Sequence, residues 1–578
     1  MFSNKQNINI LTSLLKAHGI EDAVVCPGSR NAPIVYNLQE CKQIKCHPVT
    51  DERSAGFYAL GIAQATQSPV VVCVTSGSAL LNLAPAVAEA SYQHVPLIVV
   101  SADRPQQWID QLDGQTLPQP DALLPFVRKA VTLPEPHDDE TQWYCNRLVN
   151  EALFQMTAHS NAPVHINVPI SEPLFGFDTP ELPEERVLQA LRQPITLGAN
   201  DDFLDEISKS QRPLVVIGHT AEDYINEFAM GSLTKVLTVF SESLSNGKGA
   251  VQHFDEVIRC SAYAEDNMPH IIIYVGGTLV SKPAREFLRR SKAKTYLLTT
   301  DASHIPDPTM HLAGVMECAD EFGLNSALTD IAEVCHENTN KERKRFNAFW
   351  RNEFANAQRH IDSFTPPYSQ MAAVKYLEGR IDKGNEDFHV HYANSTAIRL
   401  ANIYAKHYVW CNRGVNGIEG SLSTAAGFSL GVEEKVICVI GDLSFFYDQN
   451  ALWNINIKGN LRILLLNNLE GGIFRQLEGI PESPATKVYI AGHHATMAYG
   501  ICQQHHIEYH LAENIEEMRD GIEHLLTTES EEPIVLEVRT NAEEDAAALQ
   551  KYYSAFCGKV QNKKTKQQKN GNKRMEKD

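Results

Sequence analysis

Short runs of apolar residues alternate along the chain with longer stretches of amphipathic, helix-like pattern. The runs lie at 23–26, 70–74, 97–100, 164–168, 214–217, 236–240, 271–275, 296–298, 408–411, 436–440, 463–466 and 534–538. A short apolar run without polar alternation is typical of a strand buried on both faces, and helices between such strands indicate parallel sheets. We therefore predict an α/β fold of parallel sheets covered by helices.

The length and the proline-rich stretches predict how this fold is divided. A chain of 578 residues is too long for a single core and indicates about three domains. Residues 175–194 and 362–370 are rich in proline and are typical of linkers. We predict domains at 1–180, 195–345 and 365–556. The tail at 557–578 is basic, with eight Lys or Arg from residue 559 onward, and is expected to be disordered and solvated.

Composition excludes several classes of protein. The net charge of −20 argues against nucleic acid as the main partner. No apolar run is long enough to span a membrane, and the N-terminal residues contain no apolar signal segment. The twelve cysteines show no CxxC pair and no framework spacing, so we expect a cytoplasmic protein without disulfides or zinc.

Two of the predicted strands in the last third run directly into polar residues. The run at 436–440 leads to Gly441-Asp442, and the run at 463–466 leads to Asn467-Asn468. Ligands of open α/β sheets bind beyond the carboxyl ends of the strands. Carboxylate and amide oxygens suit Mg²⁺, which usually also holds phosphate, and Gly471-Gly472 lets backbone approach a diphosphate. Each dipeptide alone is also common in turns, but the pair at this spacing resembles the diphosphate motif of thiamine-diphosphate enzymes.

That resemblance implies a glutamate in the first domain that meets the aminopyrimidine ring of the coenzyme. Glu52 begins a stretch of small residues, "TDERSAGFYALGIAQAT", which allows close helix packing and lies at a dimer interface in this family. An acidic first turn interacting with the helix dipole is the simpler reading of Glu52 taken alone. Ile418 is the candidate side chain beneath the bent coenzyme, with plain core packing as the alternative.

Six further segments narrow the resemblance. They are "CPGSRNAPI", "TDERSAGFYALG", "TSGSALLNLAPAVAEA", "SADRP", "CNRGVNGIEGSLSTAAG" and "GDLSFFYDQNAL". In this order they are similar to the 2-succinyl-5-enolpyruvyl-6-hydroxy-3-cyclohexene-1-carboxylate synthases of menaquinone biosynthesis, from about residue 8 to about residue 556. The resemblance implies three doubly wound domains (pyrimidine-binding, central and diphosphate-binding) and a homodimer or homotetramer with sites between subunits.

In that family thiamine diphosphate and Mg²⁺ (or Mn²⁺) support decarboxylation of 2-oxoglutarate and addition of the resulting carbanion to isochorismate. The resemblance makes Glu52 catalytic and implies three sets of binding residues. For the coenzyme these are Glu52, Asn416, Ile418, Asp442, Leu443, Ser444, Asn468, Gly472, Ile473 and Phe474. For the metal they are Asp442, Asn468 and Glu470, the last through its main chain. For the substrates they are Ser29, Arg30, Arg104, Gln115, Lys282, Ser395, Arg399, Arg413, Phe474 and Leu477.

The arginines suit this chemistry because a guanidinium grips a carboxylate with two parallel hydrogen bonds. Any one of them could instead form a surface salt bridge that contributes little. Two positions depart from the family pattern: Pro283 follows Lys282 where some relatives have a second basic residue, and Leu469-Glu470 replaces a glycine-rich stretch.

Two other functions stay open at this point. An acetohydroxyacid synthase or another 2-oxoacid decarboxylase would not need so many arginines, and the central section contains no GxGxxG for a flavin. A non-catalytic protein with a decayed site is the other alternative. The presence of Glu52, Asp442 and Asn468 argues against it.

Overall fold

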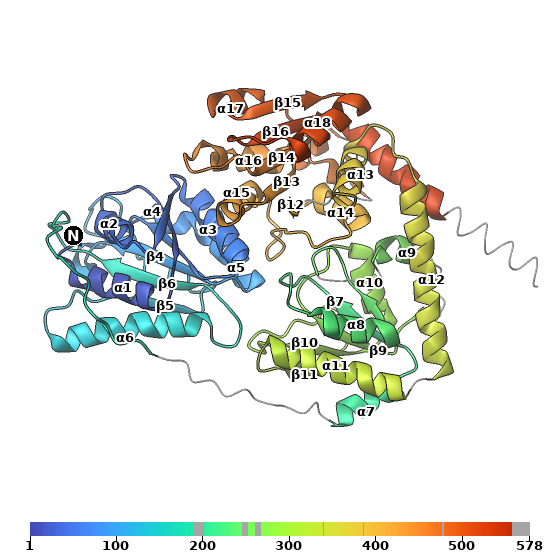
Figure 1. The fold of residues 1–578 in the computed structure, drawn as a ribbon, viewed down its shortest axis with the longest axis horizontal. Coiled ribbons are helices and arrows are strands. Elements are labelled where there is room, and N and C mark those ends of the chain that lie inside the picture. Colours follow the sequence, from blue (N-terminus) through green and yellow to red (C-terminus); the bar gives the residue numbers. More distant parts are fainter. Residues whose placement is uncertain are drawn as a thin grey trace, which may run out of the picture.

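The computed structural model describes residues 1–188, 201–245, 252–260, 267–338, 340–384, 387–476, 479–481 and 483–557. The chain forms three parallel sheets with helices on their faces, one sheet in each third of the chain (Figure 1). The predicted α/β fold of three parallel-sheet domains is confirmed. The tail from 558 onward, residues 195–200 and Leu477 lie outside the described residues, and the exact domain boundaries stay a prediction.

The first sheet has six strands in the order β2-β1-β3-β4-β6-β5. Its strands are β1 Asp22–Val25, β2 Lys45–Pro48, β3 Val70–Val74, β4 Leu97–Asp103, β5 Lys129–Thr132 and β6 Val164–Pro169. The helices are α1 Gln6–Ala17, α2 Ala32–Glu40, α3 Glu52–Thr66, α4 Ser78–Asn82, α5 Ala84–Gln93 and α6 Asp139–Met156. The inner strands β3 and β4 are buried at every residue, as their uninterrupted apolar runs predict.

The second sheet has five strands in the order β11-β10-β9-β7-β8. They are β7 Pro213–Ile217, β8 Thr238–Phe240, β9 Ile271–Val275, β10 Lys294–Thr299 and β11 Leu312–Glu317. The accompanying helices are α7 Asp201–Lys209, α8 Glu227–Val236, α9 Phe254–Cys260, α10 Lys282–Ser291 and α11 Glu321–Glu337. The long α12 Lys341–Ser363 leads from this sheet to the third (Figure 1).

The third sheet also has five strands, in the order β12-β13-β14-β16-β15. They are β12 Phe388–Tyr392, β13 Lys435–Gly441, β14 Leu461–Asn467, β15 Glu508–Ala512 and β16 Ile534–Arg539. Its helices are α13 Gln370–Ile381, α14 Thr396–Tyr404, α15 Ser421–Gly431, α16 Asp442–Tyr447, α17 Tyr499–Gln504 and α18 Ile515–Thr527, followed by a helix over 542–557. The predicted strand at 408–411 is wrong: there the chain makes only an isolated bridge between Trp410 and His391.

Helices α3 and α15 join the first and third domains through close backbone contact. A Cβ atom on Gly61 would lie 2.0 Å from the carbonyl oxygen of Thr424, and one on Gly427 would lie 2.2 Å from that of Tyr58. The Tyr58 hydroxyl donates across the same interface to the carbonyl of Ala451 at 2.6 Å. The small residues expected to allow close packing therefore hold α3 against a helix of the same chain.

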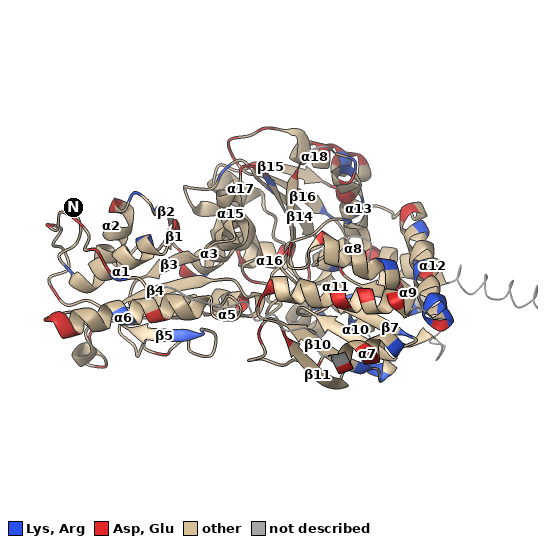
Figure 2. Ribbon diagram, turned by 60° about the horizontal axis from the view of Figure 1, so that its bottom comes forward, with Lys and Arg blue, Asp and Glu red and all other residues tan. Residues whose placement is uncertain are grey.

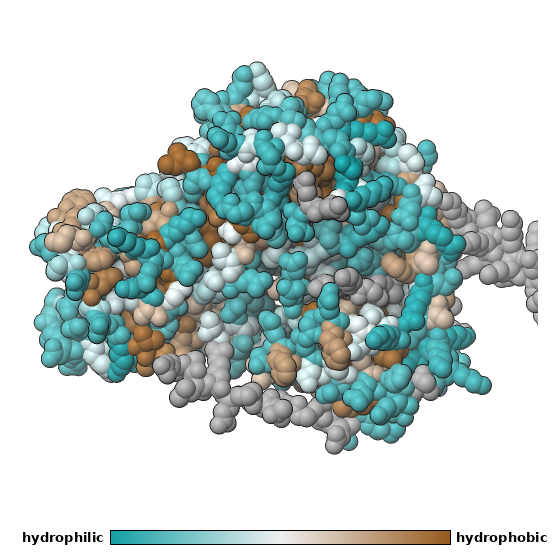
Figure 3. Space-filling model, viewed as in Figure 1, coloured by the Kyte–Doolittle hydropathy of each residue, from teal (hydrophilic) through white to brown (hydrophobic). Residues whose placement is uncertain are grey.

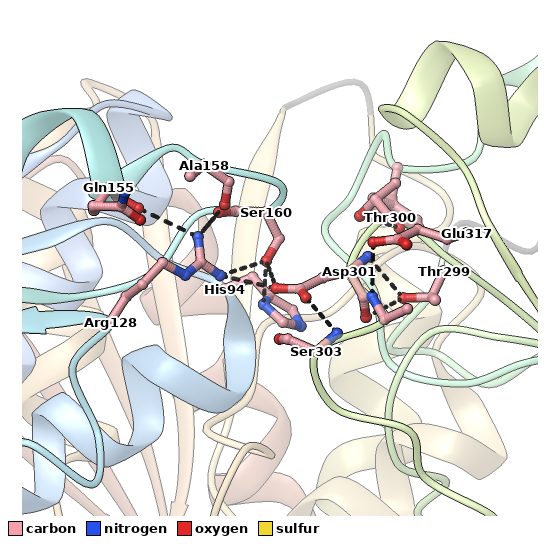
Figure 4. A network of polar contacts seen from close by, with 12 residues as sticks. His94, Arg128, Gln155, Ala158, Ser160, Thr299, Thr300, Asp301, Ser303 and Glu317 are labelled. Carbon is pink, nitrogen blue, oxygen red and sulfur yellow. Dashed lines mark hydrogen bonds and ion pairs between the residues drawn. The ribbon is translucent and has the colours of Figure 1, made fainter. Parts of the chain in front are cut away.

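A polar network joins the first and central domains (Figure 4). Arg128 and Ser160 both donate to Oδ2 of Asp301, at 2.9 and 2.8 Å. Burial alone would raise the pKa of Asp301, but hydrogen bonds from Ser303 and Ser160 and the charge of Arg128 lower it to about 2. The carboxylate thus stays ionised and fixes these domains at their junction.

The remaining fold-level expectations concern cysteines, charge and membranes. Ten described cysteines are free, but Cys557 is disulfide-bonded, so the expectation of no disulfides is wrong at this residue. Spacing along the chain could not reveal this bond, because pairing depends on proximity in the fold. Charged residues lie mainly on helices and loops rather than on the inner strands (Figure 2). Within the described residues, no helix is both long and apolar enough to cross a membrane.

Candidate active site

The carboxyl end of β13 carries a buried carboxylate with one unsatisfied oxygen. Asp442 begins α16 and is 4% exposed, and its Oδ1 accepts from the amide of Leu443 at 2.7 Å. Its Oδ2 lies 3.3 Å from Nε2 of His494, but neither atom has a partner with hydrogen-bond geometry. A buried carboxylate oxygen without a hydrogen bond is costly unless a cation or water meets it.

The end of β14, which pairs with β13, places the side-chain amides of Asn467 and Asn468 near Asp442. Asn467 donates to Oε1 of Glu537 at 2.6 Å, which turns its side chain into the sheet. Asn468 donates to Oδ2 of Asp545 at 3.0 Å, so its Oδ1 is presented on the other side and accepts only a long bond, 3.4 Å, from the amide of Glu470. We call Asp442, Asn467 and Asn468 with their flanking glycines the diphosphate edge.

The turn after Asn468 contains a further carboxylate, that of Glu470, which is paired within the chain. Leu469 has a left-handed backbone with φ of 67°. The Glu470 carboxylate is buried and forms an ion pair with Arg475. Because Arg475 holds the Glu470 side chain, the expected coordination of a metal ion by the main chain of Glu470 is compatible with the structure.

The glycines of the diphosphate edge provide space next to the oxygens. A Cβ on Gly441 would meet no atom within 4 Å, whereas one on Gly472 would lie 2.7 Å from Nδ2 of Asn468. Ile473 and Phe474 follow in a short 3-10 helix and are half-buried. An oxygen donor set with one orphaned carboxylate oxygen beside open backbone fits a hard cation such as Mg²⁺ holding a diphosphate.

Glu52 lies at the first turn of α3. Asp51 caps the helix by accepting from the amides of Arg53 and Ser54, and the half-exposed Glu52 accepts from Nδ2 of Asn82 at 3.2 Å. Arg53 donates to the carbonyl of Tyr447 at the far end of α16, at 2.9 Å. Among the described residues of one chain, no hydrogen bond or ion pair joins Glu52 to Asp442.

The loop that carries Arg413, Asn416 and Ile418 is held by a buried glutamate of the first domain. Oε1 and Oε2 of Glu89, on α5, accept from the amides of Gly414 and Val415 at 2.6 and 2.7 Å. Burial raises the pKa of Glu89, and these amides oppose the rise. Asn416 takes a left-handed φ of 70°, and Ile418 is 41% exposed.

Glu89 was missed by the sequence reasoning. Its only local signal is a single acid inside the apolar stretch "APAVAEA", since its partners lie more than 300 residues further along the chain. Asp545 and Glu537 were also missed, since the asparagines that they bind, Asn468 and Asn467, lie 77 and 70 residues earlier in the chain.

Three arginines gather between the central and third domains. Arg413 is buried, donates to Oδ1 of Asn394 at 3.1 Å, and has a buried Nε without a partner. Desolvation and then the charge of Arg413 lower the pKa of both Arg399 and Arg285. Like charges in a desolvated setting favour an anionic ligand, and we call these three residues the arginine cluster.

The central-domain member of this cluster is Arg285 rather than Lys282. The Lys282 side chain is 73% exposed and pairs only loosely, at 3.8 Å, with Glu286. Arg285 lies one helical turn further along α10, whose start is anchored by Glu242 accepting from the amides of Val280 and Ser281. Arg285 is therefore a basic residue close to Pro283, the position at which some relatives have a second basic residue.

Four other predicted substrate residues lie in the loops that follow β1 and β4 of the first sheet. Arg30 is buried and donates to the carbonyl of Ile170 at 3.0 Å, with an ion pair to Glu172. Arg104 reaches the carbonyl of Gly114 at 3.4 Å, while Ser29 and Gln115 are exposed. In the described part of one chain, no hydrogen bond or ion pair connects this group to the arginine cluster. Ser395, by contrast, lies in the third domain and accepts from Arg399 at 2.6 Å through its carbonyl.

Comparison with known families matches both ends of the chain. The family described as "Thiamine pyrophosphate enzyme, N-terminal TPP binding domain" matches residues 8–123, and "Thiamine pyrophosphate enzyme, C-terminal TPP binding domain" matches residues 393–538. The first match contains Glu52, and the second contains Asp442 and Asn468.

Similar proteins share nearly the whole length. The chain is 40% identical to the 2-succinyl-5-enolpyruvyl-6-hydroxy-3-cyclohexene-1-carboxylate synthase of Bacteroides thetaiotaomicron, over 96% of this chain and 99% of that protein. The protein of the same name from Bacteroides fragilis is also 40% identical over the same shares. That of Porphyromonas gingivalis is 32% identical over 96% of this chain and 98% of that protein.

Proposed function

The chain belongs to the 2-succinyl-5-enolpyruvyl-6-hydroxy-3-cyclohexene-1-carboxylate synthases, and we propose that it carries out their thiamine-diphosphate-dependent reaction in menaquinone biosynthesis. In this reaction 2-oxoglutarate loses CO₂ and the resulting carbanion adds to isochorismate. The observation that carries the proposal is 40% identity over 96% of the chain. The protein would then be a transferase that acts in the cytoplasm.

The diphosphate edge would hold the coenzyme and its metal ion. Asp442 and Asn468 would each offer a side-chain oxygen to Mg²⁺, or to Mn²⁺, with the main-chain carbonyl of Glu470 as a third ligand. The unpartnered Oδ2 of Asp442 supports this assignment. The remaining contacts to the coenzyme would come from Asn416, Leu443, Ser444, Gly472, Ile473 and Phe474.

Thiamine diphosphate, when bound, would supply a ring carbon that bonds to the keto carbon of the substrate and a cationic ring that takes up the electron pair left by decarboxylation. Glu52 would hold a proton between its carboxylate and N1′ of the aminopyrimidine ring, which favours the imino form of the neighbouring amine. Ile418 would support the bent coenzyme, and its exposure leaves the side chain accessible for that contact.

The arginine cluster would bind the carboxylates of the substrates. Arg413 and Arg399 offer planar donor groups on the third domain, and Arg285 would supply the central-domain cation that Pro283 does not. Arg30 and Arg104, with Ser29 and Gln115, would form the first-domain part of the substrate site. Lys282, whose side chain is 73% exposed in one chain, is the alternative central-domain cation.

A homodimer or homotetramer would complete the site by bringing Glu52 of one subunit to Asp442 of its partner. Large exposed apolar side chains support an interface near the junction of the first and third domains: Leu81, Val415, Ile418, Tyr447, Trp453 and Ile455. Figure 3 shows brown patches on this otherwise teal surface. Mixing inactive Glu52→Gln and Asp442→Ala proteins under subunit exchange should restore part of the activity, because each mixed dimer keeps one intact site.

The reaction itself is tested with purified protein, thiamine diphosphate and Mg²⁺. We expect CO₂ release from 2-oxoglutarate to be coupled to consumption of isochorismate, with pyruvate a poor donor because it lacks the distal carboxylate. Equal turnover of pyruvate would favour an acetohydroxyacid synthase-like activity instead.

A further inference from the structure

A cluster of two histidines and a glutamate lies on the third domain, at the edge strand β15. Glu508 and His510 are two residues apart in this strand, so their side chains share one face of the sheet. Helix α18 follows β15 and runs back before β16 begins, and β15 and β16 are parallel neighbours. Helix α18 lies beside β15 (Figures 1 and 2), and its last turn, which carries His524, is thereby returned to the start of β15.

The three side chains converge on one point. Nε2 of His510 and Nε2 of His524 lie 2.7 and 2.6 Å from the same oxygen, Oε1 of Glu508. All three potential ligand atoms fall within 4.8 Å of one another, and the side chains are 34–40% exposed. Among the described residues, no other three His, Cys, Asp or Glu side chains meet in this way.

Neighbouring groups prepare the cluster for a cation. Nδ1 of His524 lies 3.0 Å from Oγ1 of Thr528, which can accept a hydrogen bond from Nδ1–H; in that tautomer Nε2 keeps its lone pair for a metal ion. A metal ion at this point would replace the hydrogen bonds that now join the two imidazoles to the Glu508 carboxylate.

We propose that Glu508, His510 and His524 form a binding site for a transition-metal ion, with Zn²⁺ the preferred occupant. Two imidazoles and one carboxylate are a known type of zinc ligand set, and water can fill the fourth position where the side chains face solvent. At Zn–N and Zn–O distances near 2.0–2.1 Å, ligand atoms of a tetrahedral ion are about 3.3 Å apart. The hydrogen-bonded atoms need to separate by only about 0.6 Å, which half-exposed side chains can do. Mg²⁺ is not expected here, since it prefers oxygen ligands.

The site is independent of the diphosphate edge. Glu508 lies at the amino end of β15 and pairs with Ile534, the first residue of β16. Asp442 and Asn468 lie at the carboxyl ends of β13 and β14, on the opposite side of the same parallel sheet. A bound ion would fasten the exposed edge strand to α18 and so stabilise this side of the third domain, without touching the coenzyme.

The test uses the full-length protein, stripped of metal and then saturated with Mg²⁺ and thiamine diphosphate so that the oxygen site is filled. Zn²⁺ is titrated by calorimetry, and Co²⁺ is titrated with detection of the visible absorption of a four-coordinate ion. We expect one equivalent to bind to the parent protein and the affinity to fall at least about tenfold in His510→Ala and His524→Ala. The double variant His505→Ala/His506→Ala, on the preceding loop, is the control and should bind like the parent.

Stability gives a second readout. With Zn²⁺ at a hundred times its Kd, the folding equilibrium of the parent should shift about a hundredfold, seen as a rise in Tm that His524→Ala and the gentler His524→Gln both lack. Equal Zn²⁺ affinity and equal Tm response in the parent and these variants would overturn the proposal. The three side chains would then be a hydrogen-bonded Glu–His cluster only.

Discussion

The diphosphate edge and the arginine cluster differ in how their own polar groups are partnered within the chain. At the diphosphate edge nearly every polar atom already has a partner within the chain, and a single carboxylate oxygen, Oδ2 of Asp442, lacks one. In the arginine cluster, desolvation and then the charge of Arg413 lower the pKa of Arg399 and Arg285, and Arg413 keeps an unpartnered buried Nε.

The difference indicates two modes of preorganisation. The diphosphate edge leaves one carboxylate oxygen for a cation, so the loss of Asp442 should have a severe effect. Each arginine of the cluster would contribute a separate contact to an anion, so its members should act in a graded way and respond to the anion bound.

The largest effect is expected at the diphosphate edge. Asp442→Ala removes the orphaned oxygen, so Mg²⁺ no longer neutralises the diphosphate and activity should fall at least about a thousandfold. Asn468→Ala should cost less, because water can replace a neutral ligand. Coenzyme affinity is measured with Mg²⁺ and with chelator, and equal values for the parent under both conditions would refute the assignment.

The close contact between α3 and α15 should give the next largest effect. Gly61→Ala places a methyl group 2.0 Å from the Thr424 carbonyl, so α3 and α15 must separate, at a cost of about 3 kcal/mol in stability. Gly379→Ala, on α13, meets no atom within 4 Å and should stabilise by about 0.5–1 kcal/mol. Urea unfolding of both variants distinguishes them, and similar midpoints would contradict the close contact.

Arg413 should show the graded behaviour of the arginine cluster. A charged hydrogen bond to a carboxylate contributes about 1.5–3 kcal/mol, so Arg413→Ala should lower kcat/KM by roughly tenfold to a hundredfold. Arg413→Lys should be nearly as harmful, because an ammonium cannot form two parallel bonds. The exposed Arg289 on α10 provides the control, and Arg289→Ala should leave both KM values unchanged.

The identity of the central-domain cation gives a smaller and sharper contrast. Arg285→Ala should lower kcat/KM about tenfold through the KM of one dicarboxylate, whereas Lys282→Ala should change it less than about twofold. Steady-state kinetics with each substrate varied in turn decides between them. A larger loss for Lys282→Ala would assign the role to Lys282 and exclude Arg285.

The smallest effect should be a change in how kcat/KM depends on pH. Burial raises the pKa of Glu242 to about 6, although the amides of Val280 and Ser281 and the charge of Arg413 oppose the rise. The folded chain therefore holds this proton more tightly than the unfolded chain, and the group's contribution to stability decreases as pH rises from about 4.5 to about 6.

Below pH 6 the protonated Glu242 no longer accepts from both amides at the start of α10, and it no longer offsets the charge of Arg285. We expect a few-fold change in kcat/KM on this acidic limb, absent in Glu242→Gln. An identical limb in the variant would show that another group titrates there.

The interior of each sheet could be predicted from the sequence, and its edges could not. Every inner strand, together with β8, coincides with a predicted apolar run, whereas β2, β5, β11, β12 and β15 were missed, and each of these lies at the end of its sheet. An edge strand is covered less completely, so it tolerates polar residues: β11 alternates between half-buried and exposed positions throughout. The false strand at 408–411 shows the converse, since its Val409 is buried without pairing in a sheet.

Site residues that directly follow a predicted strand could be predicted from the sequence. Site residues whose role depends on partners far away in the chain could not. Asp442 and Asn468 stand directly after apolar runs, so sequence order alone places them on one edge. Arg285 becomes visible only when α10 is placed against the third domain. Nothing local indicates that Glu89 holds the loop of Arg413, because that contact spans the whole central domain.

The close packing of α3 on α15 also has a consequence for biosynthesis. The hydrogen bond from Tyr58 to Ala451 joins residues 393 positions apart. At translation rates of about 5–20 residues per second, the partner of α3 emerges roughly 20–80 s after α3 itself. During that time the face of the Glu52 helix that carries Gly61 has no native surface of α15 to cover it, so the first domain should leave this face exposed until the third domain has been synthesised.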